Sequence, residues 1–121
     1  MATIELDEQN FVETVNNNDI VIIDFWAPWC GPCQSFAPLY EDVSEEYPDI
    51  VFAKVNTEVQ QQLAIQFQIR SIPTLMVFRE QIILYQEAGA LPKASLQQLV
   101  TQVQELDMDE VKKSMEQPEN T

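Results

Sequence analysis

Apolar residues gather in four short stretches of this chain, and the pattern predicts a strand at each. The clearest stretch covers residues 20–26, where one acid, Asp24, interrupts an apolar and mostly β-branched sequence. Residues 51–55, 74–78 and 82–85 have a similar character. Near-continuous hydrophobicity over the length of a strand indicates burial on both faces of a sheet.

Between and after these stretches, apolar residues recur every three or four positions, which is the spacing of one face of a helix. The spacing predicts helices that include residues 11–15, 36–47, 58–67 and 96–106. Pro38 lies within the second helix and is expected to kink it, because proline lacks an amide proton and collides with the preceding turn.

The order of these elements indicates the fold class. Ile4 and Leu6 fit a short edge strand ahead of the first helix, so the predicted order is β-α-β-α-β-α-β-β-α. Alternating strands and helices indicate an α/β fold with helices on both faces of the sheet. The last two strands are joined by a short connection, and we therefore expect them to be antiparallel.

The acid-rich end of the chain differs from the rest in composition. We assign residues 1–107 to one domain and residues 108–121 to an acidic C-terminal tail, either a helical extension or disordered. Met108, Val111 and Met115 have the spacing of a helix face. A frayed tail is nevertheless expected, because terminal residues without a core to pack on rarely order.

Charge and composition reduce the number of function classes that fit this chain. The chain has 6 Lys and Arg against 20 Asp and Glu, a net charge of −14, which excludes sequence-independent nucleic-acid binding and disfavours anionic membranes. It contains no His, so no imidazole can serve as metal ligand or general base. No apolar run approaches the roughly 20 residues that span a bilayer, and the start lacks a signal-peptide pattern. We expect a cytoplasmic monomer that binds neither nucleic acid nor membrane.

The only two cysteines are Cys30 and Cys33, separated by Gly31 and Pro32. A disulfide across so short a loop adds little stability through loop entropy. Zinc would need further Cys or His ligands, which only a site shared between two chains would supply. The remaining interpretation is a redox pair, as is known for C-x-x-C near a β-α-β pattern. We expect no metal and no cofactor beyond this redox-active disulfide.

The predicted position of the pair, between a central strand and a helix, suits thiol chemistry. A thiolate is the attacking species, and a helix N-terminus stabilises it by its partial positive charge and free N–H groups. We expect Cys30 to be the exposed attacking thiol and Cys33 to be the more buried, resolving thiol. Gly31 and Pro32 allow a tight turn and limit its flexibility.

Asp24 is either a strand-end residue that reaches water or a buried carboxyl beneath the cysteines. In the second case its pKa would be raised, and it would accept the proton of Cys33 during resolution. Lys54, the lone charge in its strand, is the natural partner, although a lysine can also extend to the surface. Residues 26–39 carry no charge, and Trp29 is expected to contact substrates at the surface.

At residues 24–33, Asp-Phe-Trp-Ala-Pro-Trp-Cys-Gly-Pro-Cys, the chain resembles the active-site segment of the thioredoxin family. The likeness extends over roughly residues 3–106 and includes four further segments: 36–38, 53–56, 69–74 and 89–90. It is most similar to the second bacterial thioredoxin type, without the N-terminal zinc module of that type. The resemblance implies a thioredoxin fold, with a central mixed five-stranded sheet flanked by helices on both faces.

The resemblance also implies roles for individual residues. Cys30 would attack and Cys33 would resolve, with Asp24 and Lys54 as the buried acid and its partner. Pro73 would follow a cis peptide bond. Substrate would lie against Trp29, Gly31, Pro32, Ile72, Pro73 and Gly89. The implied activity is protein-disulfide reduction, with NADPH-dependent thioredoxin reductase as electron donor and oxidised cytosolic proteins as clients.

The chain departs from the family at residues 79–81, Arg-Glu-Gln, where the family has a glycine-containing hairpin turn. This turn cannot be assigned to a primed type that depends on glycine, so the sequence leaves its geometry open. Two other functions stay open: a disulfide oxidant or isomerase, and a thioredoxin-fold co-chaperone or complex subunit with a non-essential redox role. The Gly31-Pro32 dipeptide argues against the oxidant, because families of that kind usually have His between the cysteines.

Overall fold

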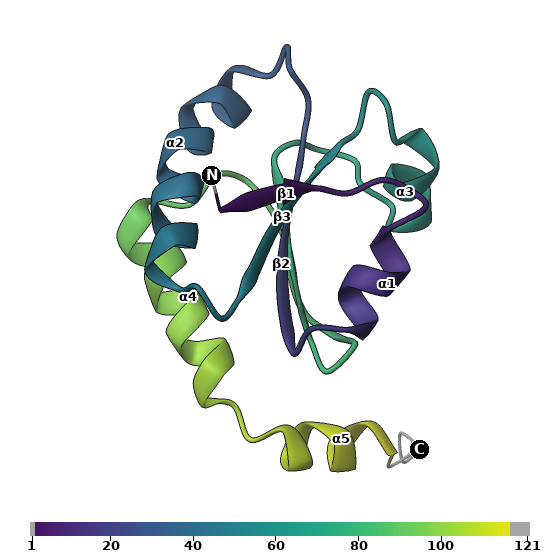
Figure 1. Ribbon diagram of the computed structural model, residues 1–121, viewed down its shortest axis with the longest axis vertical. Helices are drawn as coiled ribbons and strands as arrows, with labels where there is room; N and C mark the ends of the chain where they lie inside the picture. Colours follow the sequence, from purple (N-terminus) through teal and green to yellow (C-terminus); the bar gives the residue numbers. More distant parts are fainter. Residues whose placement is uncertain (1, 117–121) are drawn as a thin grey trace.

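Five strands form one mixed sheet in the computed structural model, which describes residues 2–116 (Figure 1). Their order across the sheet is β1-β3-β2-β4-β5. β1 and β2 run parallel to β3, whereas β4 is antiparallel to both β2 and β5. The predicted mixed five-stranded sheet is confirmed. The strands are β1 (Thr3–Glu5), β2 (Ile20–Trp26), β3 (Val51–Asn56), β4 (Thr74–Arg79) and β5 (Ile82–Ala88).

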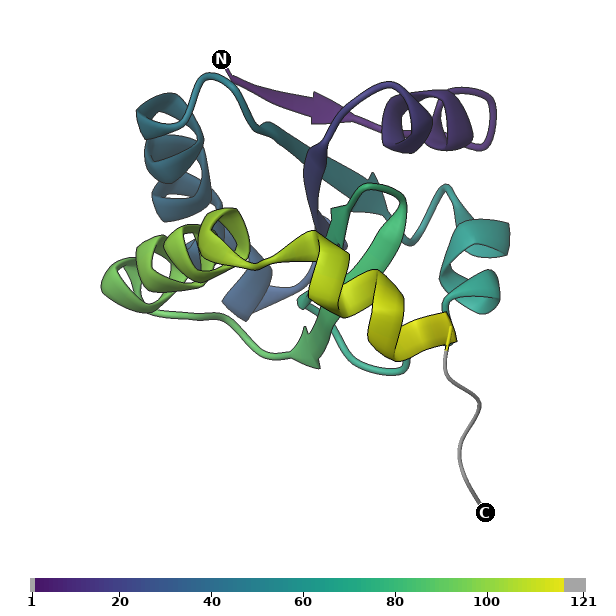
Figure 2. The ribbon, with the colours of Figure 1, turned by 90° about the horizontal axis from the view of Figure 1, so that it is seen from below.

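Helices cover both faces of the sheet, as predicted (Figures 1 and 2). Two helices, α1 and α3, lie on one face, and α2 and α4 lie on the other. Pro38 stands inside α2. The helices are α1 (Phe11–Asn16), α2 (Gly31–Glu46), α3 (Gln61–Gln66), α4 (Lys93–Glu105) and α5 (Met108–Glu116). Within residues 2–116, no helix has the length and apolar character needed to cross a membrane.

The alternation of β2 explains why its run of apolar residues is nearly unbroken. Ile20 and Ile22 belong to the core beneath α2 and α4, and Val21, Ile23 and Phe25 belong to the core beneath α1 and α3. Successive side chains of a strand point to opposite faces, so both faces of a central strand must be apolar. β2 is therefore the central strand, and the loop that follows Trp26 and leads into α2 begins at the middle of the sheet.

The β4–β5 hairpin closes with a two-residue turn, because Arg79 pairs directly with Ile82. Glu80 and Gln81 have φ values of 51° and 71°. Positive φ at both central residues is what the primed type I′ turn requires. The sequence left the geometry of this turn open, and the structure shows a primed turn without glycine, held by contacts made from outside the hairpin.

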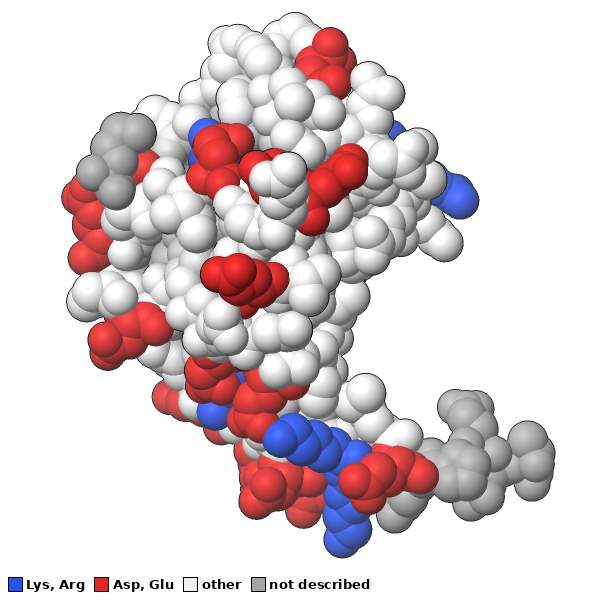
Figure 3. Space-filling model, turned by 45° about the vertical axis from the view of Figure 1, so that its right-hand side comes forward, with Lys and Arg blue, Asp and Glu red and all other residues white. Residues whose placement is uncertain are grey.

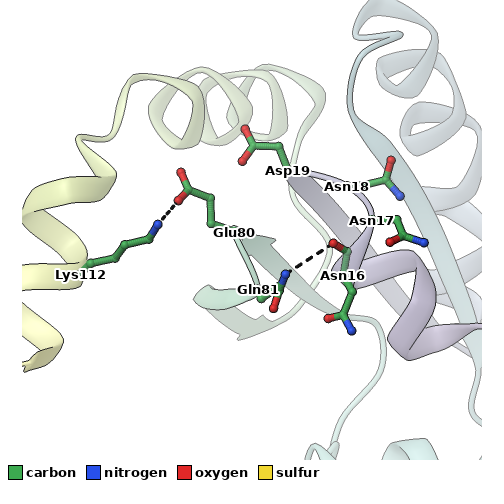
Figure 4. Close-up of a pocket in the computed structure, with 7 residues that line it drawn as sticks. All are labelled: Asn16, Asn17, Asn18, Asp19, Glu80, Gln81 and Lys112. Atoms are coloured by element: carbon green, nitrogen blue, oxygen red, sulfur yellow. Dashed lines mark hydrogen bonds and ion pairs between the residues drawn. The ribbon is translucent and has the colours of Figure 1, made fainter.

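Two neighbouring segments hold the turn (Figure 4). The N–H of Glu80 donates to the carbonyl oxygen of Asp19 at 2.8 Å, and the Glu80 carboxylate pairs with Lys112 of α5. The side-chain amide of Gln81 donates to the carbonyl of Asn16 at 3.5 Å. These contacts surround an open polar pocket and offset the conformational cost of two left-handed residues.

The beginning of the C-terminal tail is helical over Met108–Glu116, so these residues differ from the frayed state that was expected. The Asp107 carboxylate accepts from the N–H groups of Asp109 and Glu110 at 3.0 and 3.3 Å, which caps α5. Met108 is buried, and Arg79 donates to main-chain carbonyls at the end of α4. The division between residues 1–107 and 108–121 stays a prediction, and residues 117–121 lie outside the described residues.

Replacing Gln81 by Gly is expected to raise the free energy of unfolding by about 0.5–1 kcal/mol. Glycine removes the steric cost of the left-handed backbone, and its greater entropy in the unfolded chain offsets part of that gain. Urea unfolding followed by circular dichroism measures the change. The matched control, Gln98→Gly on the exposed face of α4, should lower stability by about 1 kcal/mol. A loss of stability in Gln81→Gly would contradict this explanation.

Candidate redox site

The two cysteines lie at the N-terminus of α2, where a disulfide joins them and their Cα atoms are 5.2 Å apart. Cys30 is the residue that caps the helix, with extended backbone angles of −86° and 115°. The N–H of Cys33 donates to the Sγ of Cys30 at 3.2 Å. Pro32 stands in the first turn, where a missing N–H leaves no helical hydrogen bond unmade. The sulfur thus occupies the position in which an N-capping oxygen usually accepts a helix N–H.

Both cysteines are buried in this oxidised state. Cys30 is 5% exposed and Cys33 is 2% exposed, so the expected exposure of Cys30 is not seen. The reason is that Cys30 packs in a small apolar cluster with Ala27 and Cys33, against which Trp26 and Ile72 also pack. The order of exposure follows the expectation, but the difference between the two thiols is small.

The segment before β4 lies beside the disulfide. The Ile72–Pro73 peptide bond is cis, as the family resemblance implies. The Sγ of Cys30 lies 3.7 Å from the carbonyl oxygen of Ile72. The N–H of Gly89 donates to the carbonyl of Pro73 at 2.8 Å, with Gly89 at a φ of 112°. The fold therefore brings Ile72, Pro73 and Gly89 together, and Ile72 lies beside Cys30.

Exposed uncharged residues surround the disulfide on its outer side. Gly31 and Pro32 are exposed, and Trp29 is 67% exposed, as expected for a surface contact. The indole N–H of Trp29 donates to the Glu58 carboxylate at 3.1 Å, which fixes the ring on the surface. Figure 3 shows acidic side chains spread over the visible face of the molecule, with few basic ones. The exposed residues Gly31, Pro32 and Trp29 are thus uncharged, and the Glu58 carboxylate lies at the indole edge of Trp29.

Asp24 is buried, and not a strand-end residue in contact with water. It is 1% exposed, and neither carboxylate oxygen has a hydrogen-bond partner. Burial raises its pKa to about 7, while Lys54 acts to lower the pKa and Glu5 acts to raise it. An acid with a pKa near neutrality can both accept and release a proton under physiological conditions.

Lys54 stands beside Asp24 in the register of β2 and β3. Its Nζ lies 4.5 Å from the centroid of the Trp26 ring and does not form an ion pair within 4 Å of Asp24 in the part of the chain described. Lys54 is half-buried, between the two alternatives of a buried partner and a surface lysine. The expected pairing of Asp24 and Lys54 is therefore one of register and charge, without a direct hydrogen bond.

Glu5 is a residue near this site that the sequence pattern did not indicate. It is aligned with Lys54 across β1 and β3. The only local signal is an acid between Ile4 and Leu6 in a three-residue strand. No local pattern could show that β1 pairs with β3, because the two strands are separated by most of the first half of the chain. Among residues 2–116, no group of three Cys, Asp or Glu side chains is arranged to hold a metal ion.

This arrangement can carry out thiol–disulfide exchange. Two sulfurs at a helix N-terminus exchange between a bond to each other and bonds to other sulfurs, and the helix favours the thiolate form. A buried acid with a pKa of about 7 supplies a proton acceptor on the same strand that leads into the cysteine loop. Gly31, Pro32 and Trp29 place exposed, uncharged groups beside the disulfide.

Comparison with known proteins agrees with this geometry. The thioredoxin family model matches residues 2–102. A putative thioredoxin 2 of Streptomyces coelicolor is 53% identical over 114 residues, covering 94% of this chain and 85% of the relative. Thioredoxin 1 of Nostoc sp. is 41% identical over 99 residues, covering 80% of this chain and 92% of the relative.

A solved structure shows the same fold. A mutant thioredoxin from Halobacterium salinarum NRC-1 superimposes with a TM-score of 0.79 at 31% identity, covering 87% of this chain and 93% of that one. Both the sequence and the fold are thus shared with thioredoxins over nearly the whole domain. The chain belongs to the thioredoxin family of protein-disulfide oxidoreductases.

Proposed function

We propose that this protein reduces disulfides in other proteins and that an NADPH-dependent thioredoxin reductase restores its dithiol. The observation that carries the proposal is the Cys30 sulfur, which accepts the N–H of Cys33 at the start of α2. That contact and the helix N-terminus favour a thiolate at Cys30 once the disulfide is open. The Cys30–Cys33 dithiol itself supplies the two electrons and becomes a disulfide, so the proposed reaction requires no metal or prosthetic group.

The reaction proceeds in two exchanges. The Cys30 thiolate attacks one sulfur of the substrate disulfide, a mixed disulfide forms, and the other substrate sulfur leaves as a thiolate. The Cys33 thiol then gives its proton to Asp24 and attacks the Cys30 sulfur. This step releases the second substrate thiolate and leaves Cys30 and Cys33 oxidised. Lys54 moderates the pKa of Asp24 so that the carboxylate form is available near neutral pH.

The substrate would lie as an extended segment across the surface beside the disulfide. Ile72, which precedes the cis Pro73, stands beside Cys30, and the backbone of Ile72 would hydrogen-bond to a substrate strand. Trp29, Gly31 and Pro32 form the exposed side of this surface, and Gly89 forms its edge. Oxidised cytosolic proteins are the proposed clients, and a monomer in the reducing cytoplasm fits this direction of electron flow.

The reduction potential of the Cys30–Cys33 couple tests this proposal. We expect a value near −270 mV, below a glutathione pool at roughly −220 to −260 mV, when the protein is equilibrated with dithiothreitol. Trp29 fluorescence or alkylation of free thiols would report the oxidised fraction. The Cys30→Ser/Cys33→Ser variant is the control and should show no transition. A potential near −120 to −180 mV would indicate an oxidant or isomerase and overturn the proposal.

A further inference from the structure

Glu5, Lys54 and Asp24 stand side by side on three adjacent strands. Glu5 pairs with Lys54 in the register of β1 and β3, and Lys54 pairs with Asp24 in the register of β3 and β2. Register partners in a sheet project from the same face. Ile22 and Phe52, two residues before Asp24 and Lys54, lie in the core beneath α2. The three charged side chains therefore share the face of the sheet that α2 covers.

The row formed by Glu5, Lys54 and Asp24 runs from solvent to the interior of the protein. Glu5 is exposed, Lys54 is half-buried and Asp24 is 1% exposed. A cavity opens at the solvent end between β1, β3 and α2, and its lining includes Thr3, Glu5, Ala37, Pro38, Glu41 and Lys54. One cation thus stands between two acids, one at the surface and one in the core.

Among the described residues, the Lys54 ammonium forms no ion pair within 4 Å with either Glu5 or Asp24. The ion pairs within the described residues join Arg79 to Asp19, Lys93 to Glu46 and Lys112 to Glu80. The Lys54 ammonium instead lies 4.5 Å from the centroid of the Trp26 ring. The indole nitrogen of Trp26 is buried and has no hydrogen-bond partner among the described residues. A carboxylate on either side can therefore draw the ammonium toward itself.

We propose that Glu5 is a positioning residue for the redox reaction, which competes with Asp24 for Lys54 and so makes Asp24 hold its proton more tightly. The direction agrees with the charges, because Glu5 acts to raise the pKa of Asp24 and Lys54 acts to lower it. The expected change in the rate of turnover rests on the proposed function. The expected change in the pKa of Asp24 does not depend on that function.

The other groups around the row have separate partners. From α2, the Tyr40 hydroxyl lies within hydrogen-bond distance of the Ile22 and Ala53 carbonyls. Also from α2, Glu41 accepts from the N–H of Ala2 at 2.6 Å and from the hydroxyl of Thr3 at 2.7 Å. The β4 residue paired with Asp24 is the apolar Leu75. Glu5 is thus the second acid that shares Lys54 with Asp24.

The test is the titration of Asp24 in a Glu5→Gln variant, followed by the carboxyl carbon resonance in NMR of the oxidised protein. Without the Glu5 charge, Lys54 is attracted by Asp24 alone. We therefore expect the midpoint of the Asp24 titration to fall by about 0.5–1 pH unit. Glu5→Asp keeps the charge and should keep the midpoint close to that of the parent. Glu41→Gln removes an acid from the same cavity but outside the row, and should move the midpoint by less than half as much.

Kinetics supply the second readout. In Glu5→Gln, the pH dependence of the resolving step should shift to lower pH by the same amount as the NMR midpoint. An unchanged or raised Asp24 midpoint in Glu5→Gln would overturn the proposal, as would equal shifts in Glu5→Gln and Glu41→Gln. These results are distinct from a failure of the proposed function, which the reduction potential of the cysteine couple decides.

Discussion

Replacing Asp24 by Asn is expected to raise the free energy of unfolding at pH 8 by up to about 4 kcal/mol, while slowing the redox reaction. In the folded protein the pKa of Asp24 is about 7, against roughly 3.9 in an unfolded chain. The folded state therefore binds more protons than the unfolded state between about pH 4 and 7. Stability contributed by protonated Asp24 is complete below pH 4 and is lost as the pH rises through 7.

Asparagine stays neutral at every pH and has nearly the same shape. The stabilisation should thus be large at pH 8 and near zero at pH 4, which urea unfolding at the two pH values would measure. Asp42→Asn, at an exposed position on α2, is the control and should change stability by less than about 0.5 kcal/mol at either pH. A gain that does not depend on pH would contradict the assignment of Asp24 as a buried, titrating acid.

The same variant tests the chemical role of Asp24. Without a carboxylate to accept the Cys33 proton, the resolving step should slow by about 10²-fold or more near neutral pH, within the usual range for general base catalysis. Formation of the mixed disulfide by Cys30 should change little. Rapid mixing with an oxidised model substrate separates the two steps, and an unchanged pH profile of the resolving step would remove Asp24 from the mechanism.

Replacing Cys33 by Ser is expected to arrest the reaction at the mixed disulfide and reduce turnover by more than about a hundredfold. Cys30 would still attack, but no second thiol could displace the substrate from it. Client proteins should then be recovered covalently bound to Cys30 and released by dithiothreitol. Non-reducing electrophoresis followed by mass spectrometry of the linked peptides would identify the bond.

The Cys30→Ser variant tests which of the two cysteines is the attacking thiol. Cys30→Ser should trap no clients, because Cys33 is the more buried sulfur and lies inside the first turn of α2. Trapping by Cys30→Ser instead of Cys33→Ser would reverse the assigned roles. Trapping by neither variant would favour the scaffold function, in which the fold serves a complex without redox exchange.

Local patterns in the sequence were enough to predict most elements of the fold. The apolar run of residues 20–26 became β2, and the helical spacing after the cysteines became α2, because both are properties of consecutive residues. The tail was less predictable. Its helix depends on a cap from Asp107 and on the burial of Met108 against the domain, and the burial cannot be seen in a local window.

The left-handed turn at Glu80 and Gln81 likewise could not be predicted from neighbouring residues in the sequence. Glu80 and Gln81 have no local preference for positive φ, and the partners that hold the turn, Asp19 and Lys112, lie far from it along the chain. Turn rules based on glycine therefore could not assign this turn, because distant contacts offset the conformational cost. The exposure of Cys30 was also misjudged, since it depends on how the segment containing Ile72 packs against it.

The sequence by itself determined the chemistry that this protein has available: two cysteines at a helix start, one acid in a buried strand and no histidine. Only the tertiary structure decided how these groups affect one another. The order β1-β3-β2 places Glu5 and Asp24 on either side of Lys54, and the path of the chain brings Ile72 to Cys30 and Pro73 to Gly89. Periodicity reports which face of an element is buried, but which elements become neighbours depends on the free energy of packing the whole chain.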